Sequence, residues 1–160
     1  MAVRPVPEGL EKAIPHLVVD GAARAIDFYK AAFGAQELHR SPMPDGERLM
    51  HAALKIGQST IFLNDDFPEY SNGKKRDPLS LGGSPVVIHL YVEDCDAIIK
   101  QAEKAGAKVV MPPQDQFWGD RYGMIKDPFG HSWSFATHIK DMTPEEMNQA
   151  AEEFFSKAGA

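Results

Sequence analysis

Apolar and polar positions repeat one pattern twice along the chain. Residues 14–35 and 87–107 each contain a short apolar run with one histidine, an acidic turn, a stretch of helical periodicity and a Gly-Ala pair. Apolar residues three or four positions apart indicate an amphipathic helix, and a glycine after the last of them is a common stop signal. The pattern therefore predicts two copies of a strand followed by a helix. We place the strands at 13–19 and 86–92 and the helices at 22–33 and 95–105.

Further strands are predicted after each copy. Short runs with strand character are separated by turns that contain Gly or Pro. We place them at 35–41, 48–56 and 59–64 in the first copy and at 107–110, 121–126 and 131–137 in the second, with a loop rich in Pro and aromatic residues at 111–120. A duplicated unit of this kind brings equivalent strands together about a pseudo-twofold axis. The equivalent residues His16 and His89 are therefore expected to converge on one cleft.

The remaining segments divide the chain. A polar stretch of about 20 residues at 65–85 is longer than most connections inside a compact domain, and it is either a linker between modules or a lid over a pocket. Thr143-Pro144-Glu145-Glu146 is typical of a helix start and predicts a C-terminal helix to about residue 157. The expected parts are an N-terminal arm at 1–12, a first module at 13–64, the linker or lid at 65–85, a second module at 86–140 and a C-terminal helical extension at 141–160.

Composition and charge narrow the class of protein. The chain of 160 residues is 43% hydrophobic and 25% charged, which is ordinary for a globular protein. Its net charge of −6 argues against nucleic acid as a partner. The single cysteine, Cys95, excludes an intramolecular disulfide and fits a reducing compartment. No window approaches the ~18 apolar residues of a membrane span and no signal peptide is evident, so we expect a cytoplasmic protein with no membrane partner.

Motifs spread over the chain carry a family resemblance. They are Ile26-Asp27-Phe28-Tyr29, PMPDG at 42–46, HAALKIG at 51–57, IHLYVEDCDA at 88–97, FWGDRYG at 117–123, DPFGHSW at 127–133 and ATH at 136–138. With the repeat, they resemble the vicinal oxygen chelate superfamily, which includes glyoxalase I, extradiol dioxygenases and bleomycin-resistance proteins, and in particular its PhnB-like branch. The resemblance implies an α+β fold in which two βαβββ modules form an open, curved, eight-stranded sheet around a central cleft, commonly within a homodimer.

The metal enzymes of this superfamily hold a divalent ion with one residue from each of four strands. The resemblance places three of these positions at Ile14, Val87 and Ser134, and the nearest candidates for the fourth are Phe62 and Asn64. None of the three aligned side chains is a usual metal ligand. We therefore expect no metal cofactor, and neither glyoxalase-type nor extradiol chemistry.

A displaced metal site is a second interpretation. His16 and His89 each lie two residues beyond one of these positions, and a shift of two along a strand keeps a side chain on the same face, about 6.6–6.8 Å away. His138 has the same parity as Ser134. The two imidazoles are expected either to line a polar pocket or, with further ligands, to hold Zn²⁺, Ni²⁺, Fe²⁺ or Mn²⁺.

The segment 117–122 is the other candidate for contact with a ligand. Aromatic faces and a guanidinium can hold a planar or anionic molecule, so Trp118, Arg121 and Tyr122 are expected at the mouth of the cleft. The alternative is a hydrophobic corner with a surface ion pair between Asp120 and Arg121. Elsewhere, Cys95 is expected to fill the core.

Three functions follow from these patterns. The leading hypothesis is a protein that binds a small organic molecule, for sequestration or turnover. Its expected ligand-binding residues are His16, His89, Phe62, Asn64, Trp118, Arg121, Tyr122 and Ser134. The second hypothesis is a metal-dependent lyase, isomerase or dioxygenase that uses the displaced site at His16 and His89. The third is a non-catalytic interaction protein that docks a partner on the C-terminal helix.

Overall fold

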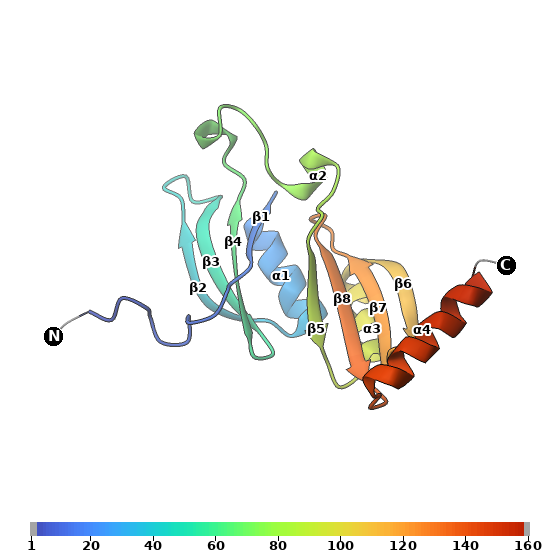
Figure 1. Cartoon of the computed structure of the whole chain (residues 1–160). Helices are drawn as coiled ribbons and strands as arrows, with labels where there is room; N and C mark the ends of the chain where they lie inside the picture. Colours follow the sequence, from blue (N-terminus) through green and yellow to red (C-terminus); the bar gives the residue numbers. More distant parts are fainter. Residues whose placement is uncertain (1–2, 159–160) are drawn as a thin grey trace. The chain divides into compact units, whose positions relative to one another are not determined.

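Two compact units make up the chain, Met1–Gly83 and Ser84–Ala160. The computed structural model describes residues 3–158, so residues 1–2 of the expected N-terminal arm and 159–160 of the expected C-terminal extension lie outside the described residues. Each unit has its own sheet and its own buried core, and Figure 1 labels the elements of both.

The first unit is a four-stranded mixed sheet with one helix packed on it. Its elements are β1 His16–Val19, α1 Ala22–Phe33, β2 Gln36–Pro42, β3 Leu49–Ile56 and β4 Ser59–Asp65. The strand order is β1-β4-β3-β2, in which β1 is parallel to β4 and the other neighbours are antiparallel. A short 3-10 helix, η1 Pro68–Tyr70, and a short helix, α2 Pro78–Leu81, follow the sheet.

The second unit repeats this topology and adds a helix. Its elements are β5 Val87–Tyr91, α3 Cys95–Ala105, β6 Lys108–Asp115, β7 Asp120–Lys126, β8 Ser132–His138 and α4 Pro144–Ala158. The strand order is β5-β8-β7-β6, again with the first strand parallel to the last. The equivalence of β1 and β5 is therefore confirmed, as are the α+β class, the two βαβββ modules and the C-terminal helix. Each sheet has four strands. The arrangement of both sheets around one cleft stays a prediction.

Local sequence explains where the helices begin and end. Gly34 and Gly106 end α1 and α3 in the left-handed conformation, with φ of 65° and 116°. Asp94 caps α3 by accepting a hydrogen bond from the backbone N–H of Ala97. At α4, Thr143 and Glu146 each bond the other's backbone N–H, which is the capping box that the sequence predicts. The bounds of α1 and α3 agree with the predicted ones.

Most strand bounds differ from the predicted ones by one to three residues, and two segments differ more. β6 continues to Asp115, through Pro112-Pro113, where a loop was expected. It is an edge strand whose pairing with β7 shifts register between Met111 and Gln114. An edge strand tolerates proline, because the missing backbone N–H donor can lie on the unpaired side. The second difference is that the polar stretch 65–85 contains η1 and α2, the latter starting with the capping residue Asp77.

The core of each unit lies between its sheet and its helix. In the second unit Thr137 on β8 accepts a hydrogen bond from the backbone N–H of Cys95, the first residue of α3. Alternation along β8 therefore directs Trp133 and Phe135, both 0% exposed, toward α3. The even-numbered residues of β8 lie on the opposite face of the sheet, which carries the candidate site.

Candidate functional site

We call the side of the second sheet that is turned away from α3 the His89 face. Pairing places His89 of β5 beside Ser134 of β8, and Ala136 between Tyr91 and Tyr122. The residues of this face used below are His89, Tyr91, Asp120, Tyr122, Ser134 and His138, together with Trp118 from the loop before β7.

A buried carboxylate lies at the centre of the His89 face. Asp120 is 5% exposed and receives three side-chain donors. Its Oδ2 accepts hydrogen bonds from Tyr91 Oη at 2.9 Å and Trp118 Nε1 at 3.1 Å, and its Oδ1 bonds His138 Nδ1 at 2.8 Å. Burial raises the pKa of Asp120, but hydrogen bonds from His138 and Tyr91 outweigh it, so the pKa is lowered. The carboxylate is therefore ionised and fixes the rings around it.

His138 connects this carboxylate to solvent. Its side chain is 53% exposed, and its Nε2 bonds Oδ1 of Asp141 at 3.0 Å. The hydrogen bonds with Asp120 and then Asp141 raise the pKa of the imidazole. One ring nitrogen is thus held by a buried acid, while the other bonds an exposed carboxylate.

His89 organises the other end of the face. Its Nδ1 lies 2.8 Å from Oγ of Ser134, which is only 2% exposed. The His89 ring meets Tyr91 edge-on at 5.0 Å and stacks on Tyr122 at 6.0 Å between centroids. Trp118 packs against Tyr122 at 5.8 Å. The structure therefore brings together four predicted site residues, namely His89, Ser134, Trp118 and Tyr122.

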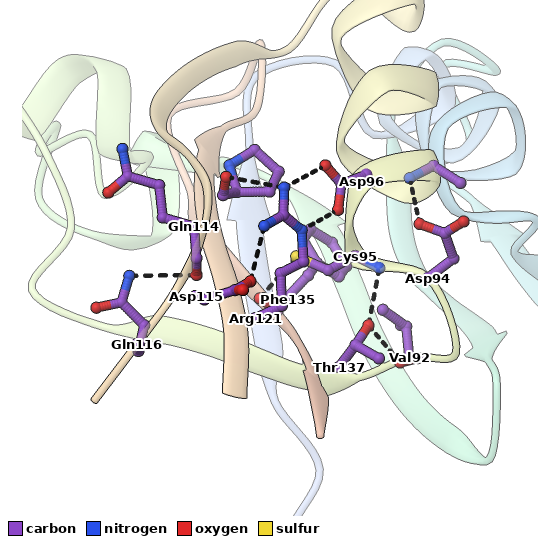
Figure 2. A network of polar contacts seen from close by, with 12 residues as sticks. Val92, Asp94, Cys95, Asp96, Gln114, Asp115, Gln116, Arg121, Phe135 and Thr137 are labelled. Carbon is purple, nitrogen blue, oxygen red and sulfur yellow. Dashed lines mark hydrogen bonds and ion pairs between the residues drawn. The ribbon is translucent and has the colours of Figure 1, made fainter. Parts of the chain in front are cut away.

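Arg121 does not join this group. Successive residues of β7 point to opposite faces, so Arg121 lies on the side of α3 while Tyr122 lies on the His89 face. Figure 2 shows its guanidinium bonded to both oxygens of Asp96 on α3 and to Asp115 on β6, the latter at 2.8 Å. These carboxylates raise the pKa of Arg121 further. The side chain ties α3 to the edge of the sheet, and its partners differ from the expected Asp120.

Cys95 belongs to the same structural region as Arg121. The thiol is 1% exposed and donates to the backbone carbonyl of Phe135 at 3.3 Å (Figure 2). Burial raises the pKa of the thiol. Its expected place in the core is confirmed.

In the first unit, three histidines lie on the corresponding face of the sheet. His16 of β1, His51 of β3 and His39 of β2 follow one another, with centroid distances of 5.9 Å and 6.3 Å, and His51 also meets Phe62 at 4.7 Å. Burial and then the neighbouring His16 and His39 lower the pKa of His51. Asn64, the other predicted residue of β4, donates to the carbonyl of Asp65 at 2.6 Å.

The positions that the resemblance assigns to metal ligands do not fit a divalent ion. Ile14 and Val87 are hydrocarbons, Ser134 is bonded to His89, and Phe62 packs against the ring of His51. Within residues 3–158, no three side chains of His, Cys, Asp and Glu are grouped to hold a metal. In the same range, no helix has the length and apolar character needed to cross a membrane.

The C-terminal helix packs through aromatic rings. Phe117 lies 5.2 Å from Phe154 and 6.0 Å from Phe155, measured between ring centroids. Phe154 and Phe155 nevertheless stay 49% and 64% exposed. This helix therefore leaves apolar surface in solvent.

Sequence reasoning missed the residues at the centre of the His89 face. The predicted ligand-binding residues do not include Tyr91 or Asp120, and His138 enters the prediction only through its parity with Ser134. A signal was present, because Tyr91 shares the parity of His89, and an acid and an imidazole stand at facing ends of two predicted strands. The combination of a guanidinium with neighbouring aromatic residues instead favoured Arg121.

Comparison with known proteins agrees with this architecture. The model of the Glyoxalase/Bleomycin resistance protein/Dioxygenase superfamily matches residues 13–135. A protein of Mycobacterium bovis (strain ATCC BAA-935 / AF2122/97), named only as uncharacterized, is 54% identical over 136 residues, or 85% of this chain and 89% of its own. The crystal structure of TioX from Micromonospora sp. ML1 is 26% identical with a TM-score of 0.60, over 83% of this chain and 100% of that one.

A fourth comparison concerns the fold alone. The PhnB protein from Bacillus cereus is 17% identical with a TM-score of 0.60, over 79% of this chain and 99% of that one. The duplicated topology and the family match over most of the length point to the same group. The chain belongs to the Glyoxalase/Bleomycin resistance protein/Dioxygenase superfamily.

Proposed function

We propose that this protein binds a small, planar organic molecule on the His89 face, without the metal ion of its enzyme relatives. The observation that supports the proposal is the connected cluster around Asp120. Aromatic rings and a few fixed polar groups form one surface there, which is how small-molecule sites are usually built. Tyr91 is 64% exposed, so part of this aromatic surface is accessible.

The chemistry of the face favours a neutral or cationic aromatic ligand over an anionic one. Tyr122, Trp118 and Tyr91 offer π-faces on which a ring can stack. Asp120 places a buried negative charge behind these rings. Because Arg121 is held by two carboxylates on the other side of the sheet, we leave it out of the proposed site. His89 and His138 supply the exposed polar groups that orient the ligand.

A ligand screen tests the proposal. A compound that binds only the folded protein raises the melting temperature, and Trp118 provides a fluorescence signal for titration. We expect Tyr122→Leu to weaken the best aromatic compound by about 2- to 10-fold, the effect of losing one aromatic pair. Tyr70→Leu is the matched control, because Tyr70 is 76% exposed in the first unit. Equal weakening by both variants, or no binder in a broad aromatic library, would contradict the proposal.

Metal analysis separates this proposal from a displaced metal site. We expect untagged protein to carry no stoichiometric Zn²⁺, Ni²⁺, Fe²⁺ or Mn²⁺. Stoichiometric metal that is lost on both His16→Ala and His89→Ala would instead favour a lyase, isomerase or dioxygenase. The convergence of His16 and His89 on one cleft stays a prediction.

A partner protein on α4 is the competing non-catalytic function. The exposed rings of Phe154 and Phe155 support it. Phe155→Ala would then abolish association while leaving the ligand screen unchanged.

We also expect a homodimer, which sedimentation velocity tests directly.

A further inference from the structure

We propose that His138 is an acid–base residue, oriented by Asp120, that exchanges a proton with an enolisable α-aryl carbonyl compound on the His89 face. This inference rests on the proposed function. It adds a reaction to the binding site and assigns a chemical role to the exposed nitrogen of His138.

The first support is the way in which the imidazole is held. The buried Asp120 accepts from Nδ1 at 2.8 Å and is itself fixed by Tyr91 and Trp118. A carboxylate in this position sets the neutral ring to the tautomer with hydrogen on Nδ1, which leaves the lone pair on Nε2. The same carboxylate stabilises the imidazolium that forms when Nε2 takes a proton. An acid that orients a histidine in this way is the usual support of a general base.

The second support is the accessibility of Nε2. Its partner Asp141 is fully exposed, and exposed ion pairs contribute little free energy. A ligand atom can therefore replace Asp141 without a large cost. The charged or titratable groups that face His138 are Asp120 from β7, Tyr91 on the far side of Asp120, and Asp141 from the segment after β8.

The third support is the chemistry that these neighbours allow. Ser134 is 2% exposed and bonded to His89, so its hydroxyl is not presented as a nucleophile. The exposed base shares its partner Asp120 with the aromatic residues Tyr91 and Trp118, which suits an aryl ring with an acidic hydrogen on the adjoining carbon. Nε2 takes this proton, and the C–H electron pair moves into the enolate. The imidazolium then returns a proton to carbon or to oxygen, so the net change is isomerisation or hydrogen exchange, and no oxidant or reductant is consumed.

The test follows hydrogen–deuterium exchange of 2-indanone, a planar and neutral ketone, by ¹H NMR in D₂O. After subtraction of the protein-free rate, we expect His138→Gln to lower the exchange rate by about 100-fold, at the low end of typical general acid–base contributions. His39→Gln is the control, because His39 is exposed on the first unit, and its rate should equal that of the unaltered protein.

The pH profile distinguishes proton transfer from a structural role. The rate should rise with pH as the imidazolium of His138 loses its proton. The midpoint should lie above the ordinary histidine pKa of 6.5, because Asp120 and Asp141 raise the pKa. Asp141→Asn should keep the exchange and move the midpoint to lower pH. A purely structural role predicts no movement of the midpoint.

Binding of 2-indanone is measured separately by quenching of tryptophan fluorescence. If 2-indanone binds but the unaltered protein exchanges its hydrogen no faster than His138→Gln does, this inference is overturned. The proposed function then still stands. Absence of both binding and exchange also overturns it, since the proposal commits to this class of compound. The proposed function itself fails if the wider aromatic library yields no ligand, or if Tyr122→Leu and Tyr70→Leu weaken the best compound equally.

Discussion

Replacing Asp65 should destabilise the first unit through backbone donors that lose their acceptor. The side chain is 6% exposed, and its Oδ1 accepts from the N–H groups of Gly21 and Ala22, each at 2.9 Å. Its Oδ2 accepts from the N–H of Leu49 at 2.7 Å. One carboxylate thus joins the turn before α1 to the start of β3.

The free energy of unfolding should fall by an amount that depends on the substitution. In Asp65→Asn the amide oxygen can keep the two bonds at the turn, but the amide NH₂ then faces the N–H of Leu49. Losing one hydrogen bond to a charged group should cost about 2–3 kcal/mol. In Asp65→Ala all three donors lose their acceptor, and at about 1–2 kcal/mol each the cost should be about 3–6 kcal/mol.

Urea denaturation followed by far-UV circular dichroism measures both values. Both tryptophans, Trp118 and Trp133, lie in the second unit, so amide exchange at Leu49 provides the local signal for the first. The matched control is Asp20→Asn, the same chemical change at an exposed position of the same turn, which should stay within about 0.5 kcal/mol of the unaltered protein. Equal stabilities of the two Asn variants, with unchanged exchange at Leu49, would refute the reasoning.

Three further predictions concern single side chains. Arg121→Met should lower the free energy of unfolding by about 1–2 kcal/mol, because charged hydrogen bonds are lost at a partly exposed site. Ligand affinity in the fluorescence titration should stay unchanged, and a reduced affinity would return Arg121 to the site. Hydrogen bonds from Arg40 and Lys30 lower the pKa of Glu37 from 4.5 to about 2, so its stabilising effect is present above pH 4.5 and disappears as pH falls toward 2. Acid titration of stability should therefore be steeper for the unaltered protein than for Glu37→Gln across that interval. Cys95 should react with a thiol reagent only after unfolding, and rapid labelling of the folded protein would contradict its burial.

Parts of the fold followed from local signals, and the face of a side chain followed where the alternation of its strand was applied to it. Apolar spacing and the two glycines Gly34 and Gly106 predicted α1 and α3 because helix periodicity and C-terminal caps are encoded locally. Strand alternation and the family resemblance together also predicted His89 and Ser134 on one face, since both lie inside strands that the sequence predicts.

The misplaced expectation about Arg121 has a physical cause. β7 begins at Asp120, one residue earlier than the predicted strand 121–126, and that predicted strand already contains both Arg121 and Tyr122. The expectation that Trp118, Arg121 and Tyr122 all meet one ligand treats them as a single segment and leaves out the alternation of that strand. Within a strand, Arg121 and Tyr122 must point apart. The partners of Arg121 on α3 and β6 lie outside its own strand, and no local sequence pattern predicts these contacts.

The parallel pairing of β5 with β8 has a consequence for the order in which the second unit can assemble. The hairpins β6–β7 and β7–β8 close short loops, whereas the contact of His89 with Ser134 spans 45 residues. Closing a longer loop costs more chain entropy, and contacts of high sequence separation slow folding. On the ribosome, β5 and α3 emerge well before the strand that pairs with β5. A nascent chain that stops short of residue 132 can hold a helix and a hairpin, but the His89 face does not exist until β8 has been synthesised.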